Sequence, residues 1–128
     1  MLKFIKLLKT TNFESGTKNN PQFNSFYRSF MADMKRALDG YVNDFEMHKG
    51  HFYAYGFFKT NYGETYFFSI SDVRFFPNEK MLVRTTEHFA GDKIPEHTQN
   101  QYIALDENFE NNIQKFIMKK IQAVFATW

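Results

Sequence analysis

The sequence predicts a single α+β domain in which an antiparallel β-meander of three to four strands is flanked by an N-terminal and a C-terminal amphipathic helix. Apolar residues recur at helical spacing near both ends of the chain, whereas the residues between follow the two-residue period of strands. The length of 128 residues suits one domain with one core, so we assign residues 1–128 to a single domain.

Residues 1–20 are predicted to form an N-terminal segment and a loop. The first nine residues mix apolar and lysine side chains, which indicates a short amphipathic helix or a first strand docked on the domain, with an interfacial membrane anchor as the alternative. The apolar runs here are two residues long, shorter than the core of a signal peptide. No stretch of the chain is apolar enough to span a bilayer, and the cytoplasm is the default compartment.

A helix is predicted over residues 21–40. Asn20 is suited to cap it, Pro21 fits the first helical position, and Gly40 is placed to end it. Its apolar stripe recurs every three or four residues and consists of Phe23, Phe26, Tyr27, Phe30, Met34, Ala37, Leu38 and Tyr41.

The β-meander is predicted over residues 51–105, after a further helical turn or connector over 42–47. Strand patterns cover 51–59, 65–76 and 81–86, and a fourth short strand is predicted over 101–105. The polar stretch 88–100 contains Pro95 and is predicted to be a long loop. Asp106 then caps a last amphipathic helix over 106–126.

The chain contains more aromatic residues than one sheet face requires. Eleven of its 25 aromatic residues lie between Phe52 and Phe76, and pairs such as Phe57 with Phe58 are adjacent in sequence. Because successive strand residues point to opposite faces, rings must occupy both faces of the sheet. One face builds the core, and the other needs a cover: more of this chain, a second copy, a partner protein or stacked bases.

The resulting hypothesis is a small non-enzymatic binding protein that acts through an aromatic sheet surface, in association with itself or with a host protein. One alternative is single-stranded nucleic-acid binding by base stacking, and another is a small enzyme of unrecognised type. Asp72, Arg74 and Arg84 are expected near one hairpin end, as a structural ion pair or an anion pocket. The candidate binding residues are Tyr53, Tyr55, Phe57, Lys59, Tyr66, Phe68, Asp72, Arg74, Arg84 and His88.

The polar residues match no recognised catalytic or metal-binding pattern. Without cysteine there is no thiol nucleophile and no thiolate zinc site, and no carboxylate completes a metal-ligand pattern with the four histidines, His48, His51, His88 and His97. No nucleophile-elbow glycine pattern or nucleotide-binding glycine motif is present. We therefore expect no cofactor and no metal, and the net charge of +2 is too small to indicate a polyanionic partner.

Residues 66–78 (YFFSISDVRFFPN) and 82–88 (LVRTTEH), followed by Gly91 and Asp92, are similar to small uncharacterised proteins of bacterial conjugative elements and phages. Gly91-Asp92-Lys93 replaces a pair of glycines that this resemblance would predict. The similar stretch contains no catalytic motif, and what the resemblance implies is an origin in a mobile genetic element.

Overall fold

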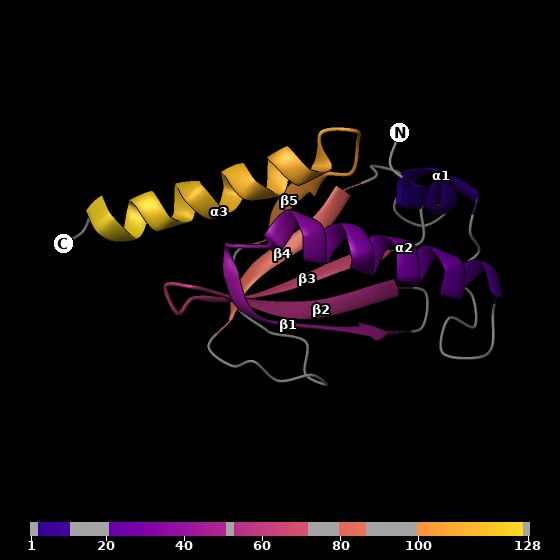
Figure 1. Cartoon of the computed structure of the whole chain (residues 1–128), viewed down its shortest axis with the longest axis horizontal. Helices are drawn as coiled ribbons and strands as arrows, with labels where there is room; N and C mark the ends of the chain where they lie inside the picture. The colour runs from indigo at the N-terminus through magenta and orange to yellow at the C-terminus, as the bar shows by residue number, and fades with distance from the viewer. Residues whose placement is uncertain (1–2, 11–20, 51–52, 72–79, 87–99, 127–128) are drawn as a thin grey trace.

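A computed structural model of the chain describes residues 3–10, 21–50, 53–71, 80–86 and 100–126 (Figure 1). The described part contains three helices and five strands. The helices are α1 (Lys3–Thr10), α2 (Pro21–Leu38) and α3 (Phe109–Ala126), and the strands are β1 (Val42–Lys49), β2 (Tyr53–Thr60), β3 (Thr65–Ser71), β4 (Lys80–Thr86) and β5 (Gln101–Ala104). The predicted α+β class is confirmed, with five strands instead of three to four.

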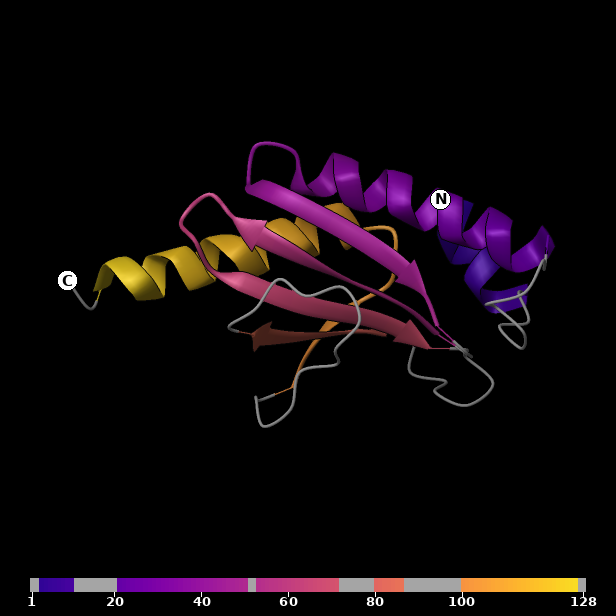
Figure 2. The same ribbon diagram turned by 90° about the horizontal axis from the view of Figure 1, so that it is seen from below.

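The five strands form one antiparallel sheet in the order β1-β2-β3-β4-β5, so each strand pairs with its neighbour in sequence. The helices gather on one side of this sheet, as the two perpendicular views show (Figures 1 and 2). Apolar side chains of all three helices and of one sheet face form a single core, which includes Phe4, Phe30, Phe58, Phe68 and Phe109. The molecule therefore has two layers, helices over a sheet.

Helix α2 follows its predicted stripe closely. It begins at Pro21 and ends at Leu38, two residues before Gly40, whose φ of 83° is in the left-handed region that favours glycine. Its buried side chains are Phe23, Phe26, Phe30, Asp33, Met34, Ala37 and Leu38. Asp33 is the one charged residue in this list.

The sequence of the first nine residues is compatible with a short helix or a strand, and the structure shows helix α1 from Lys3 to Thr10. Phe4, Ile5 and Leu8 of α1 are buried. The Phe4 ring lies 5.1 Å from the ring of Phe30 and 5.2 Å from that of Phe109. Helix α1 is thus docked on the domain at the junction of α2 and α3. No helix in the described part of the chain is long and apolar enough to cross a membrane.

The prediction of a helical turn or connector over residues 42–47 is wrong, because these residues belong to strand β1. Phe45 and Met47 pack against the core, while Glu46 alternates with them and pairs directly with Phe57 of β2. Only two apolar side chains in β1, Phe45 and Met47, show the two-residue period of a strand. Because the other residues of the segment are mostly polar, the sequence does not indicate a strand there. The meander consequently begins at Val42 instead of residue 51.

The last helix has the predicted cap. The backbone N–H of Asn108 donates to the Asp106 carboxylate at 2.8 Å, and regular helix begins at Phe109. Of the predicted loop 88–100, all but Asn100 lies outside the described residues, and so do residues 72–76 of the predicted second strand.

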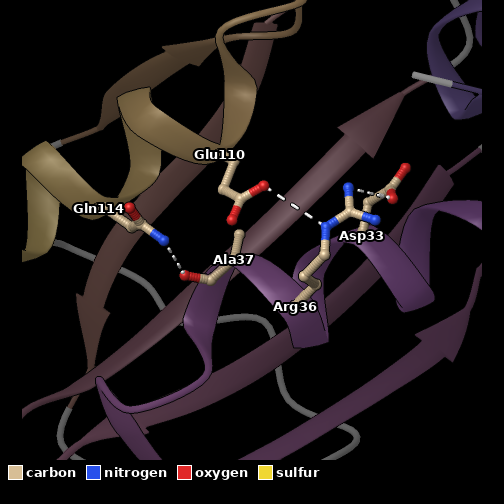
Figure 3. A network of polar contacts seen from close by, with 5 residues as sticks. All are labelled: Asp33, Arg36, Ala37, Glu110 and Gln114. Carbon is tan, nitrogen blue, oxygen red and sulfur yellow. Dashed lines mark hydrogen bonds and ion pairs between the residues drawn. The ribbon is translucent and has the colours of Figure 1, made fainter. Parts of the chain in front are cut away.

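A polar network joins α2 to α3 on the outer side of the helical layer (Figure 3). Arg36 forms ion pairs with Asp33 at 2.8 Å and with Glu110 at 3.4 Å. One turn further along α3, the Gln114 amide donates to the backbone carbonyl of Ala37 at 2.9 Å. These contacts fix the two helices relative to each other above the sheet.

Candidate functional site

The sheet face turned away from the three helices, which we call the distal face, is the candidate site. Strand register defines it, because directly paired residues of antiparallel strands point to the same side. Glu46 pairs with Phe57, which pairs with Phe67, which pairs with Arg84. The same alternation places on this face Asp44, Glu46, His48, Tyr53, Tyr55, Phe57, Lys59, Thr65, Phe67, Ser69, Lys80, Leu82, Arg84 and Tyr102.

Two predicted binding residues, Tyr66 and Phe68, do not lie on this face. Both point toward the helices and are fully buried in the core, with the Tyr66 ring 5.5 Å from that of Phe116 on α3. The register explains the error: Lys59 pairs with Thr65 after the turn, so the even-numbered residues of β3 face the helices. Because residues 66–68 are all aromatic, the sequence does not indicate which of them point toward the core and which point away from it.

Phe57 lies on the distal face as predicted, but it is 1% exposed, and its neighbour Phe67 is 2% exposed. Their rings make an edge-to-face contact with centroids 5.5 Å apart. The centre of the distal face is therefore withdrawn from solvent. Side chains available for contact lie on either side of this pair.

Toward the β1 edge lies a cluster of half-buried polar and aromatic side chains, Glu46, His48, Tyr53 and Tyr55, which we call the tyrosine cluster. The rings of Tyr53 and Tyr55 are 5.4 Å apart, and the His48 ring lies 5.3 Å from that of Tyr55. The Nε2 atom of His48 lies 2.8 Å from a carboxylate oxygen of Glu46. Because His48 pairs with Tyr55 across β1 and β2, this arrangement follows directly from the strand register.

Helix α2 borders the same corner of the sheet. The Lys49 ammonium lies 5.1 Å above the Tyr27 ring and donates to the Asn24 side chain at 2.5 Å. Burial raises the pKa of the Tyr27 hydroxyl, and the nearby Tyr55 hydroxyl raises it further. Tyr27 consequently retains a neutral hydroxyl that can donate a hydrogen bond.

Toward the β5 edge, the distal face presents Leu82 and Tyr102, which pair with each other across β4 and β5. Tyr102 is 60% exposed, the largest value among the exposed large hydrophobic residues described. Tyr102 is not among the candidate binding residues predicted from the sequence. The signal that could have identified it is its alternation with Ile103, which is buried and therefore places Tyr102 on the opposite face.

The predicted group of Asp72, Arg74 and Arg84 is described only at Arg84. Asp72, Arg74 and His88 lie outside the described residues. Arg84 is on the distal face, and its Nε donates to the side-chain oxygen of Asn100. Lys59 is also on this face, partly buried, opposite Asp44 of β1 and Thr65 of β3.

Among the residues that the structure describes, no three His, Cys, Asp or Glu side chains gather as metal ligands would. What the distal face offers is aromatic surface, hydroxyl groups and charges of both signs, a composition suited to non-covalent recognition. Comparison with protein-family models, curated proteins and solved structures gave no match.

Proposed function

We propose that this chain is a non-enzymatic binding protein that uses the distal face, centred on the tyrosine cluster, to associate with another protein. The observation that carries the proposal is the contact between Tyr53 and Tyr55. Tyrosine supplies large contact area with few rotatable bonds and keeps a polar tip, so it is enriched at the centres of protein interfaces. The resemblance to proteins of mobile elements makes a host protein the first class of partner to test.

The alternative, base stacking on single-stranded nucleic acid, has less support in this geometry. Of the five aromatic side chains among the candidate binding residues, Tyr66 and Phe68 lie in the core and Phe57 is covered. The carboxylate of Glu46 lies within the tyrosine cluster, where it would repel phosphates. A carboxylate beside tyrosine faces instead favours a basic side chain of a protein partner, which can pair with the acid and lie over a ring.

Site-specific photocrosslinking in host cells tests the proposal. A photoreactive phenylalanine derivative is placed at Tyr55, and, as a matched control, at Tyr62, which is 56% exposed in the turn after β2. We expect a discrete protein adduct from position 55 that position 62 does not give. The captured protein is then purified, and its dissociation constant is measured with the wild type and with variants.

Alanine at both Tyr53 and Tyr55 should weaken binding of that purified protein by about 30-fold, the effect of losing about 2 kcal/mol at an interface centre. Tyr62→Ala should leave the affinity unchanged. The proposal is wrong if Tyr62→Ala weakens binding as much as the double variant. It is also wrong if a labelled oligothymidylate binds in a salt-sensitive way that the double variant abolishes, because that result assigns the face to nucleic acid.

A further inference from the structure

Strand β1 forms one edge of the sheet, and among the described elements it pairs only with β2. It is eight residues long, twice the length of β5 at the opposite edge. A long edge strand presents a row of backbone N–H and C=O groups that can pair with another strand. The sheet register shows which residues of β1 carry these groups.

The backbone N–H of Gly50 donates to the carbonyl of Tyr53 at 2.8 Å, which marks residues 50 and 53 as a hydrogen-bonded pair. Such pairs alternate with non-hydrogen-bonded pairs along an antiparallel ladder. Glu46 and His48 therefore direct their backbone groups toward β2. Phe45, Met47 and Lys49 direct theirs outward, to the side of β1 on which no described strand pairs.

A second copy of β1 is the strand that fits this edge, because the charges on its distal face disfavour registers centred on Phe45 or Glu46 and favour the one centred on Met47. In a pairing centred on Phe45, Asp44 would lie opposite Glu46 of the other copy, and in one centred on Glu46 two carboxylates would meet. Carboxylates placed directly opposite each other destabilise a sheet. A pairing centred on Met47 instead places Glu46 opposite His48 in both halves, and it uses all three outward-facing residues.

We propose that β1 is a self-recognition strand, and that two copies of the chain pair antiparallel about a two-fold axis at Met47 to form one continuous sheet. Each Glu46 then lies between its own His48 and the His48 of the second copy. On the helical side, Phe45 lies opposite Lys49. The two tyrosine clusters become neighbours on a common distal face. This assignment rests on the β1 edge and is independent of the proposed protein partner.

Cysteine crosslinking tests the register, since the chain has no native cysteine. In a hydrogen-bonded pair the two Cα atoms are about 5.5 Å apart, within the range that a disulfide spans, so Met47→Cys should crosslink readily under mild oxidation. Lys49→Cys is the matched control. Two residues at position 49 would be offset by four positions, roughly 13 Å, which is too far.

The control is stringent because Lys49 is exposed whereas Met47 is partly buried, so random collision would favour position 49. We expect the disulfide dimer of Met47→Cys to form at least tenfold faster than that of Lys49→Cys. Equal rates, or faster crosslinking at 49, would overturn the proposal. Preferential crosslinking of Phe45→Cys or Glu46→Cys would also overturn it, because it would place the two-fold axis at that residue instead of at Met47.

Solution mass provides a second test that needs no cysteine. Sedimentation of the wild type should show a concentration-dependent dimer of twice the 15.3 kDa chain mass. His48→Glu places two carboxylates opposite each other, at positions 46 and 48 of the two copies, and should yield a monomer. Combining Glu46→His with His48→Glu again places a histidine opposite a glutamate and should restore the dimer. A wild type that stays at 15.3 kDa at every concentration, or a swapped variant that stays monomeric, would refute the assignment.

Discussion

Phe57 and Phe67 face each other across β2 and β3 with ring centroids 5.5 Å apart, and both are buried although they point away from the helices. The Tyr55 ring extends this contact, with its centroid 6.1 Å from that of Phe67. The sheet therefore has an apolar centre on its distal face in addition to the core beneath the helices. Part of the aromatic surplus therefore stabilises the fold, and the tyrosines beside it are the ones that the proposed binding function uses.

The burial of Phe67 predicts a large loss of stability on truncation. Phe67→Ala should lower the free energy of unfolding by about 3–5 kcal/mol, because it removes a buried ring and leaves a cavity. Tyr102→Ala, at an exposed position of the same face, should change it by less than about 0.5 kcal/mol. Urea unfolding followed by circular dichroism measures both. Equal costs for the two variants would mean that Phe67 is not covered in solution.

Gly56 is predicted to tolerate no side chain. A Cβ atom there would overlap the backbone carbonyl oxygen of Glu46 and approach the Phe68 ring to 2.7 Å. Since a backbone atom of β1 is the obstacle, Gly56→Ala must displace β1 or the ring, and we expect a loss of about 3 kcal/mol or more in the free energy of unfolding.

Gly50→Ala is the matched control for Gly56→Ala. At Gly50 the new Cβ would meet the ring of Tyr53, at 2.5 Å. Tyr53 is only half-buried, so its ring can rotate away, and the cost should be about 1 kcal/mol or less. Thermal unfolding of the two variants compares them directly. A milder effect at position 56 than at 50 would contradict the close packing of β1 on β2.

The helical network predicts unequal roles for the two acids that contact Arg36. The Asp33 side chain is 11% exposed and that of Glu110 is 44% exposed, so removing the guanidinium leaves a nearly buried charge only at Asp33. Arg36→Met should cost about 1–2 kcal/mol, and Glu110→Gln less than about 0.5 kcal/mol. Adding Asp33→Asn to Arg36→Met should recover stability, which a double-mutant cycle in urea measures. No recovery would show that the buried carboxylate is not the source of the cost.

The helices were predictable because their signals are local. In α2 a proline start, an uninterrupted apolar stripe and a terminal glycine all indicate the same boundaries. The N-terminal cap of α3 by Asp106 is similarly short-range. Strand β1 was not predictable, because its residues such as Asn43, Asp44 and Glu46 have low strand propensity, and β1 forms through pairing with β2 and packing of Phe45 and Met47.

The sequence predicts that the candidate site is rich in aromatic residues, but not which aromatic residues belong to it. The surplus of rings required aromatic residues on both faces, which the structure confirms with Phe58 beneath the helices and Tyr55 on the distal face. Which residues occupy which face depends on register, and register is set by the turn between Lys59 and Thr65. Pairing of β1 with β2 also brings His48 beside Tyr55, residues that no sequence motif connects.

Tyr66 predicts a loss of stability in alkali. Its hydroxyl donates to the Glu64 carboxylate, and burial, that hydrogen bond and the negative charge all raise the pKa of Tyr66 well above its usual range. The unfolded chain releases this proton near pH 10, whereas the folded protein retains it. The stabilising contribution is therefore complete below about pH 10 and decreases as the pH rises further.

Tyr66→Phe isolates this contribution. At pH 8 the wild type should be more stable by about 1–2 kcal/mol, through its hydrogen bond to a charged acceptor. Above pH 10 this advantage should shrink by up to about 1.4 kcal/mol per pH unit, because only the wild type must keep the proton at position 66. Urea unfolding of both proteins at pH 8 and pH 11 measures the two differences, and the alkaline sensitivity of the other tyrosines cancels in the comparison. A stability difference that is the same at both pH values would show that Tyr66 titrates alike in the folded and unfolded chain.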